Sequence, residues 1–218
     1  MASDRAAISP QHLPSIADIE AWPEFTAESP MRILVSGCVA GLLCGYDGTS
    51  YGEYELPRRI FARPNVCVTS FCPEDSQFGT PRELCNIHGG TGFDVLDGRA
   101  RVLTESGSDW TDRMIRAANE MLLRARQNSV HLALLMDISA ACGSQVIYDG
   151  VRANQKYQRG AGVCAALLMR NGYKVVSQRD DRTLHTILRK LDHQHAIDSA
   201  AVDHHEREWY RTYFAETT

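Results

Sequence analysis

The stretch RILVSGC, residues 32–38, joins a short apolar run to a glycine and then to a cysteine. An apolar run of this length that meets a turn is typical of a strand buried on both faces. Similar runs occupy residues 65–70, 131–136 and 173–177. Strands buried on both faces are typical of parallel sheets, so we expect these four runs to be strands of one parallel sheet.

Helical patterns separate the later strands. Residues 110–128 predict a helix, with Ser108 or Asp109 as its N-cap, and residues 162–170 predict another that ends at the pair Asn171-Gly172. The first of these helices repeats its apolar residues at helical spacing, at Met114, Ala117, Ala118, Met121, Leu122 and Ala125. Strands alternating with helices predict an α/β fold, a Rossmann-like open and mainly parallel sheet flanked by helices.

The chain divides into three parts. Residues 1–30, which are broken by four prolines, form an N-terminal arm, and residues 31–178 form the α/β domain. Residues 179–218 form a helical C-terminal extension, which we expect to pack on this body or on a second subunit through Leu184, Ile187, Leu188 and Leu191. Within the domain, residues 92–103 alternate around Asp97-Gly98 and predict a hairpin.

The composition excludes several classes of protein. The 218 residues are 44% hydrophobic and carry a net charge of -4, as expected for a globular chain with one good core. No apolar run approaches the roughly 18 residues that a membrane span requires, and the N-terminus lacks a secretory leader, so we expect a cytoplasmic protein. The acidic balance disfavours general binding of nucleic acid. Seven cysteines in such a chain indicate metal binding or catalysis rather than disulfides.

Three of the cysteines follow predicted strands directly. Cys38, Cys72 and Cys142 come just after the first, second and third apolar runs. The carboxyl ends of parallel strands share one edge, where such folds bind ligands, so the three thiols can converge. Three thiolates suit zinc, copper or an iron–sulfur cluster, and a cubane with three cysteine ligands leaves one iron open. The alternative is that cysteines, which are often buried, lie there by chance.

The other cysteines give weaker indications. Cys44 could be a fourth ligand or a redox partner, although an incidental loop cysteine is the favoured interpretation. We expect Cys67, inside a strand, and Cys164, on an apolar helix face, to be buried away from the site. The sequence around Cys85 indicates neither a ligand role nor burial.

The histidines of the extension lie in the pairs His193/His195 and His204/His205. Spacings of one and two do not place side chains on one helical face, so we expect a solvated surface rather than metal ligands.

Five ordered motif regions between residues 31 and 178 resemble the domain of unknown function 523 family, whose understood members are thiouracil desulfidases. They are VSGCVAG at 35–41 with CGYDG at 44–48, FCPE at 71–74 with GTPR at 79–82, ISAACG at 138–143, IYDG at 147–150, and GAGVCAALL at 160–168. The chain departs from the family pattern at Gly45, where an arginine is frequent, and at Ile138, where a lysine is frequent.

The resemblance implies a 4Fe-4S cluster on Cys38, Cys72 and Cys142 whose open iron binds the sulfur of a substrate. It also implies catalytic roles for Glu74 and Ser139. We therefore expect a desulfidase that removes sulfur from a small thiolated pyrimidine by non-redox hydrolysis and releases hydrosulfide, with Glu74 moving protons and Ser139 orienting the heterocycle. A non-catalytic iron–sulfur or zinc sensor is the alternative, and a thiolated tRNA is a further but less favoured substrate because the chain is acidic.

Overall fold

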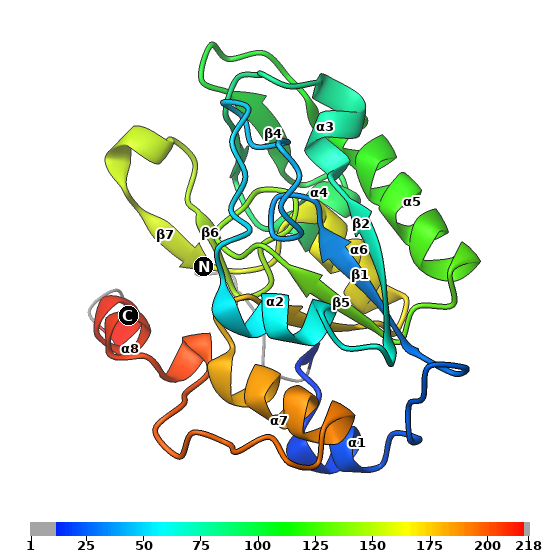
Figure 1. Ribbon diagram of the computed structural model, residues 1–218. Helices are drawn as coiled ribbons and strands as arrows, with labels where there is room; N and C mark the ends of the chain where they lie inside the picture. Colours follow the sequence, from blue (N-terminus) through cyan, green and yellow to red (C-terminus); the bar gives the residue numbers. More distant parts are fainter. Residues whose placement is uncertain (1–11, 216–218) are drawn as a thin grey trace.

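The computed structural model describes residues 12–215, and its centre is a four-stranded parallel sheet in the order β2-β1-β5-β8. Figure 1 shows this sheet in the middle of the molecule, with helices on both of its faces. The strands are β1 (Met31–Ser36), β2 (Val66–Phe71), β5 (Leu132–Leu135) and β8 (Lys174–Ser177). All four predicted strands are therefore present, and the predicted α/β class is confirmed.

Strand β1 shows why both faces of the sheet are covered. Leu34 packs in the same core as residues of α5 (Thr111–Gln127) and α6 (Val163–Arg170). Its neighbours Ile33 and Val35 face the other way, into a second core. Burying each of these side chains contributes on the order of 1.5–3 kcal/mol, so two hydrophobic layers hold the strand.

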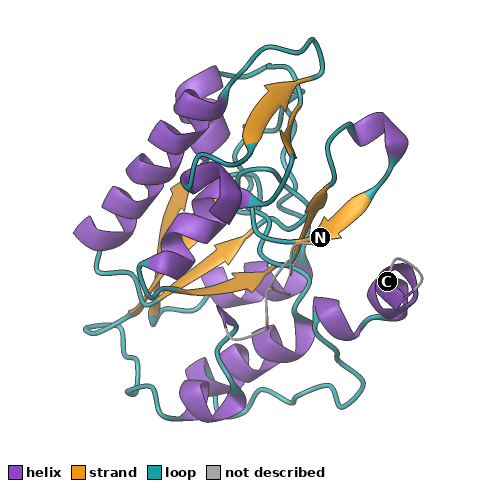
Figure 2. Cartoon of the chain, turned by 180° about the vertical axis from the view of Figure 1, so that it is seen from behind, coloured by secondary structure: helices purple, strands orange, loops and turns teal. Residues whose placement is uncertain are grey.

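The second core is built by helices from both ends of the chain. It includes residues of α1 (Ile16–Glu20), α2 (Glu55–Phe61) and α7 (Asp181–Leu191). Figure 2 shows the sheet from behind, with helices on both sides of it. Helix α7 buries the face predicted from the sequence, namely Leu184, Ile187, Leu188 and Leu191. The expectation that the extension packs on the body is thus confirmed.

Helix α5 buries the face that its periodicity predicts: Met114, Ala117, Ala118, Met121, Leu122 and Ala125. Its N-cap is Trp110, not Ser108 or Asp109, and Trp110 makes no side-chain capping bond. Asp109 still contributes, because its Oδ1 accepts the N–H of Thr111 at 2.9 Å.

Shorter elements lie at the carboxyl edge of the sheet. Strands β3 (Cys85–His88) and β4 (Arg101–Thr104) form one antiparallel pair, and β6 (Val146–Tyr148) and β7 (Tyr157–Arg159) form another. Helix α3 (Pro73–Phe78) follows β2, and the short 3-10 helix η2 (Arg152–Asn154) connects β6 to β7.

The hairpin predicted over residues 92–103 is wrong in its first half. Residues Gly92–Leu96 form helix α4, and only Arg101–Thr104 is a strand, which pairs with β3 instead. The carboxylate of Asp94 accepts the backbone N–H of Thr91 at 2.8 Å and its hydroxyl at 2.9 Å. This local capping favours a helical turn over the extended form that alternation alone suggests.

The structure of the two ends of the chain differs from the predicted N-terminal arm and helical C-terminal extension. Residues 1–11 of the predicted arm lie outside the described residues, whereas α1 packs against α7. The extension is helical only in part, because 192–203 is irregular between α7 and the elements η3 (His204–Glu206) and α8 (Glu208–Ala215). Within residues 12–215, no helix has the length and apolar character that a membrane span needs.

Candidate active site

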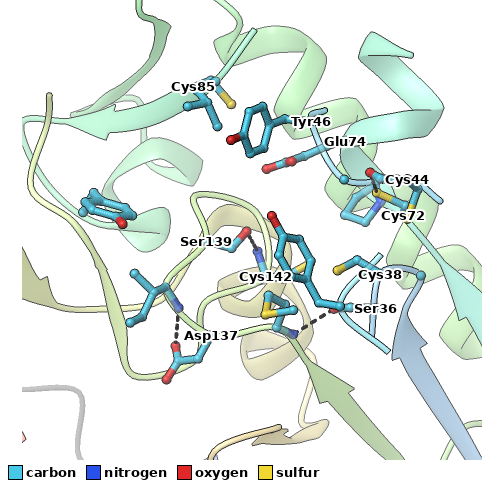
Figure 3. A pocket seen from close by; sticks show the side chains of 18 of the residues that line it. Ser36, Cys38, Cys44, Tyr46, Cys72, Glu74, Cys85, Asp137, Ser139 and Cys142 are labelled. Atoms are coloured by element: carbon cyan, nitrogen blue, oxygen red, sulfur yellow. Dashed lines mark hydrogen bonds between the residues drawn. The ribbon is translucent and has the colours of Figure 1, made fainter. Parts of the chain in front are cut away.

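The strands β2, β1 and β5 are neighbours, and each is followed by one of the three predicted cysteines. Cys38, Cys72 and Cys142 all line one cavity of about 350 Å³ at the carboxyl edge of the sheet. Figure 3 shows these side chains beside one another, with Cys44 close to Cys72. The parallel sheet therefore brings together thiols that are far apart in the sequence.

Gly37 lets the loops after β1 and β2 approach each other. Its N–H donates to the carbonyl of Phe71 at 2.9 Å, which continues the sheet by one bond. A Cβ at this position would lie 3.0 Å from the Sγ of Cys44 and 3.2 Å from the Cβ of Cys72. Only glycine fits without moving a cysteine, which explains the order Ser-Gly-Cys at the end of β1.

Cys72 begins helix α3 as its N-cap. Its Sγ accepts the N–H of Asp75 at 3.4 Å, and Pro73 occupies the first turn, where a missing N–H has no cost. The position of the thiol is therefore set by both the strand end and the helix start.

Cys142 lies in a turn that Ser139 organises. The Oγ of Ser139 accepts the N–H of Cys142 at 3.1 Å and that of Ala141 at 3.2 Å. Ser139 lines the cavity, so its hydroxyl hydrogen remains available for a ligand. Ser139 therefore caps this turn with its side chain while it faces the cavity.

Cys44 belongs to the same group of thiols, although the sequence favoured an incidental role. Its side chain hydrogen-bonds with those of Cys38 and Cys72, and it lines the cavity. The bond with Cys38, supported by burial, raises the pKa of Cys44 to about 11, against a lowering effect of the bond with Cys72. The spacing of six residues from Cys38 did not reveal this contact, because it depends on how the intervening loop folds back.

The neutral form is also favoured at Cys72 and Cys142. The hydrogen bond with Cys44, followed by burial, raises the pKa of Cys72, and burial is the main cause that raises the pKa of Cys142. Thiolates would be costly in such a crowded and buried set unless a cation neutralised them.

Glu74 is held by an ion pair. Its Oε2 accepts from the Nη2 of Arg82 at 2.8 Å, and the side chain of Arg82 is only 4% exposed. The same guanidinium donates to the carbonyls of Cys44 and Gly79, so Arg82 braces the loops rather than reaching for a ligand. Among the described residues nothing hydrogen-bonds to Oε1 of Glu74, which leaves one oxygen open at the cavity.

Aromatic rings complete the wall of the cavity, and sequence reasoning missed them. The lining residues include Tyr46, Tyr51, Tyr54, Tyr148 and Tyr157. Two of them, Tyr46 and Tyr148, stand in the motifs at 44–48 and 147–150. Flat rings on several walls suit a flat heterocycle.

The remaining cysteines follow expectation only in part. Cys164 is fully buried and does not line the cavity, as predicted. Cys67 is exposed, so the prediction that it is buried is wrong. The reason is that β2 is an edge strand of the sheet and its burial is incomplete. Cys85 is buried and lines the far side of the cavity, next to Tyr46 in Figure 3.

The expectation of solvated histidines is wrong for two of the four. His195 is 6% exposed and His204 is 1% exposed. His195 bonds to His185 and Arg59, whereas the Nδ1 of His204 lies 2.5 Å from the Oδ2 of Asp137, a cavity residue. Spacing rules for a helix do not apply here because 193–203 is irregular.

The donor set of the cavity fits an iron–sulfur cluster. No three His, Cys, Asp or Glu side chains within residues 12–215 are arranged to hold one ion. A 4Fe-4S cubane is larger than an ion and needs its thiolates spread around an open space, which the cavity provides. Its soft iron atoms also match a set of sulfur donors.

A parallel α/β sheet with thiols gathered at its carboxyl edge defines the class of protein, an α/β enzyme with a sulfur-lined cavity. Residues 33–180 match the family model described as 2-thiouracil desulfurase, and the chain belongs to this family of enzymes. The match ends before α7, η3 and α8.

The chain is also similar to two known proteins. The chain is 38% identical over 149 residues to the uncharacterized protein YbbK of Bacillus subtilis (strain 168). This match covers 68% of this chain and 96% of that protein. The chain also resembles the solved structure of the 4Fe-4S-dependent thiouracil desulfidase TudS. The TM-score is 0.57 at 33% identity, over 67% of this chain and 89% of that one.

Proposed function

We propose that the protein is a hydrolytic desulfidase that acts on a thiolated pyrimidine, of the 2-thiouracil kind, as base, nucleoside or nucleotide. Water supplies an oxygen to the ring carbon of the thiocarbonyl, and the sulfur leaves as hydrosulfide. The carbon keeps its oxidation state, so the reaction needs no electron donor. Membership of the family and the sulfur-lined cavity support this assignment.

The observation that carries the proposal is the convergence of Cys38, Cys72 and Cys142 from three neighbouring strand ends on one cavity. These three side chains would hold a 4Fe-4S cluster with one iron free of protein ligands. When bound, the cluster would supply a Lewis acid with affinity for sulfur. Cys44 contacts two of the three ligands, and we assign it no ligand role.

Glu74 is the group that moves protons. Arg82 fixes its Oε2, so the open Oε1 is directed by the ion pair rather than by chance. A carboxylate held in this way can take a proton from attacking water and later return it to the leaving sulfur. Pro73, between Glu74 and Cys72, restricts the backbone and keeps the carboxylate near the thiols.

Ser139 orients the substrate. Its Oγ is fixed by two backbone N–H groups, so the hydroxyl hydrogen has a defined direction from which to bind an oxygen or nitrogen of the ring. Such orientation raises the rate by holding the thiocarbonyl carbon within reach of water.

The test is an anaerobic assay of the whole chain. Protein reconstituted with iron and sulfide should show the optical spectrum of a 4Fe-4S cluster and should release sulfide and uracil from 2-thiouracil in equal amounts. The matched controls are the same protein without reconstitution and the protein loaded with zinc, both of which should be inactive. A protein that holds its cluster but releases no sulfide from any thiolated base, nucleoside or nucleotide would instead be a sensor.

A further inference from the structure

The loop after β5 is organised around one buried carboxylate. The Oδ1 of Asp137 accepts backbone N–H groups at 2.9–3.3 Å, and the donors are Ile138, Ser144, Gln145 and Val146. These donors lie on both sides of Ser139 and Cys142. The shape of the loop that presents these two side chains therefore depends on Asp137.

This loop also contains a strained residue. Ile138 has φ 59°, a left-handed conformation that a β-branched side chain adopts only when its surroundings impose it. Its N–H is bound by both Asp137 and the carbonyl of Val146. Loosening Asp137 would remove part of what holds Ile138 in this conformation.

The second oxygen of Asp137 is bound from the C-terminal extension. The Nδ1 of His204, 67 residues downstream, lies 2.5 Å from Oδ2, and both side chains are almost fully buried. Burial raises the pKa of Asp137, but the hydrogen bond and charge of His204, together with backbone donors, lower it below its usual value. The ionised form is the one that can accept all these N–H groups.

His204 is itself held firmly. Its N–H donates to Asp180 at 3.0 Å, and its ring stacks on Trp209 with centroids 5.8 Å apart. Asp203, the preceding residue, accepts both the N–H and the hydroxyl of Thr183 at 2.9 Å. These contacts anchor η3 to the start of α7.

We propose that the C-terminal extension completes the active site, with His204 as a positioning residue that binds Asp137 and thereby holds Ser139 and Cys142 in place. The proposal rests on the proposed function for the roles of those two residues. Helix α7, η3 and α8 lie beyond the part of the chain that matches the family model. The contact of His204 with Asp137, which we call the brace, is therefore a feature of this chain's own extension.

A pair of variants isolates the contact. Within residues 12–215 nothing hydrogen-bonds to the buried Nε2 of His204, so Nδ1 is the ring nitrogen that binds Asp137. His204→Asn places an N–H donor near the position of Nδ1, whereas His204→Gln places its donor near the position of Nε2. The matched control is His195→Gln, which changes another buried histidine of the extension, one whose side-chain partners are Arg59 and His185.

The first readout is the alkylation rate of Cys142 in the cluster-free, full-length protein, followed by mass spectrometry of the modified peptide. Cys142 is buried, so the rate reports local opening of the loop. His204→Gln should raise this rate roughly ten- to a hundredfold, the effect of losing one hydrogen bond to a charged group. His204→Asn should restore it to near the wild-type rate, and His195→Gln should leave it unchanged.

A wild-type alkylation rate in folded His204→Gln would overturn the proposal. If that variant fails to fold, Asp137→Asn tests the same contact from the other side and should also raise the rate. The readout needs neither cluster nor substrate, so it separates this inference from the proposed function. If His204→Gln is alkylated faster but the wild-type protein has no desulfidase activity, the contact between His204 and Asp137 is supported and the proposed function is wrong. If the wild-type protein is an active desulfidase but alkylation of His204→Gln is unchanged, the proposed function is supported and the role of His204 is wrong.

In the reconstituted enzyme, His204→Gln should lower kcat with a smaller change in KM, since Ser139 and Cys142 are displaced while the rest of the cavity stays. The same variant should alter the electron paramagnetic resonance spectrum of the reduced cluster, and His204→Asn should restore it. Unchanged kcat and spectrum alongside faster alkylation would contradict the placement of Cys142 by His204.

Discussion

The two sides of the cavity are held by different means. On the side formed after β1 and β2, the stabilising contacts come from within residues 37–82: Gly37 bonds to Phe71, and Arg82 joins Glu74 to the carbonyl of Cys44. On the side formed after β5, Asp137 is braced by His204 from the far end of the chain. The first side is built within the part of the chain that matches the family, and the second depends on an added segment.

The difference has an energetic consequence. Arg82 makes four hydrogen bonds at the cavity, so the loss of one leaves its guanidinium still bound to several acceptors. The pair of Asp137 and His204 is more deeply buried, and removing one partner of such a pair leaves an uncompensated charge at high cost. We therefore expect the shape of the β5 loop to depend on this single contact, whereas the chemistry of the site depends most on the thiols and the carboxylate of the first side.

The largest effect is expected from the thiols of the first side. Cys72→Ser should abolish both the cluster and the activity, because serine is a hard and poorly acidic ligand for iron. Cys44→Ser, a neighbouring thiol in the same cavity, should keep the cluster. Iron and sulfide contents with the optical spectrum measure this, and loss of the cluster in Cys44→Ser would make Cys44 a ligand.

The next effect concerns Glu74, on the same side. Glu74→Gln keeps the size of the side chain and a hydrogen bond with Arg82 but removes the proton acceptor. Turnover should fall by about 10²- to 10⁴-fold while the cluster spectrum persists. The control is the exposed Glu53→Gln, which should be as active as wild type, measured as sulfide release. Wild-type turnover in Glu74→Gln would mean that another group transfers the proton.

Much of the body could be predicted from the sequence, because burial imposes regular patterns. The apolar run of β1 and the face of α5 from Met114 to Ala125 follow from strand and helix periodicity. The convergence of Cys38, Cys72 and Cys142 follows from one further rule, that the carboxyl ends of parallel strands share an edge.

The features that escaped prediction depend on contacts rather than on patterns. Residue Asp94 capped a helix where alternation suggested a hairpin, and Cys67 lies exposed because the order of the strands puts β2 at the edge. The contact between His204 and Asp137 joins an irregular segment to a loop, and neither has a period. For this reason the first side of the cavity was foreseen more fully than the second.

A smaller effect is expected at Ser139, on the β5 side. Ser139→Ala removes the acceptor for two backbone N–H groups and should lower the free energy of unfolding by about 1 kcal/mol, as the loss of a cap does. Ser76→Ala is the control on the other side, because Ser76 is exposed and should change stability by less than about 0.5 kcal/mol. Denaturant unfolding of both proteins measures the difference, and equal values would show that Ser139 does not brace its turn.

The smallest effect, and the one that separates the two buried histidines, is on acid stability. The pKa of Asp137 is lower in the folded protein than in the unfolded chain, so its contribution is present above about pH 4 and is lost as the pH falls through the folded value. Without His204, one of the causes that lower the pKa of Asp137 is lost while burial still raises it, so this pKa rises. The midpoint of acid unfolding of His204→Gln should therefore move to higher pH, by up to about one unit.

In the control His195→Gln, the midpoint of acid unfolding should move to lower pH or stay unchanged. Burial, with the charge of Arg59, lowers the pKa of His195, so its contribution is present above about pH 6.5 and is lost as the pH falls below it. Removing this group takes away a cause of acid instability rather than adding one. Unfolding followed by circular dichroism from pH 7 to pH 2 measures both midpoints. A rise of the same size in both variants would show general damage to the extension, and only a rise confined to His204→Gln supports a specific brace on Asp137.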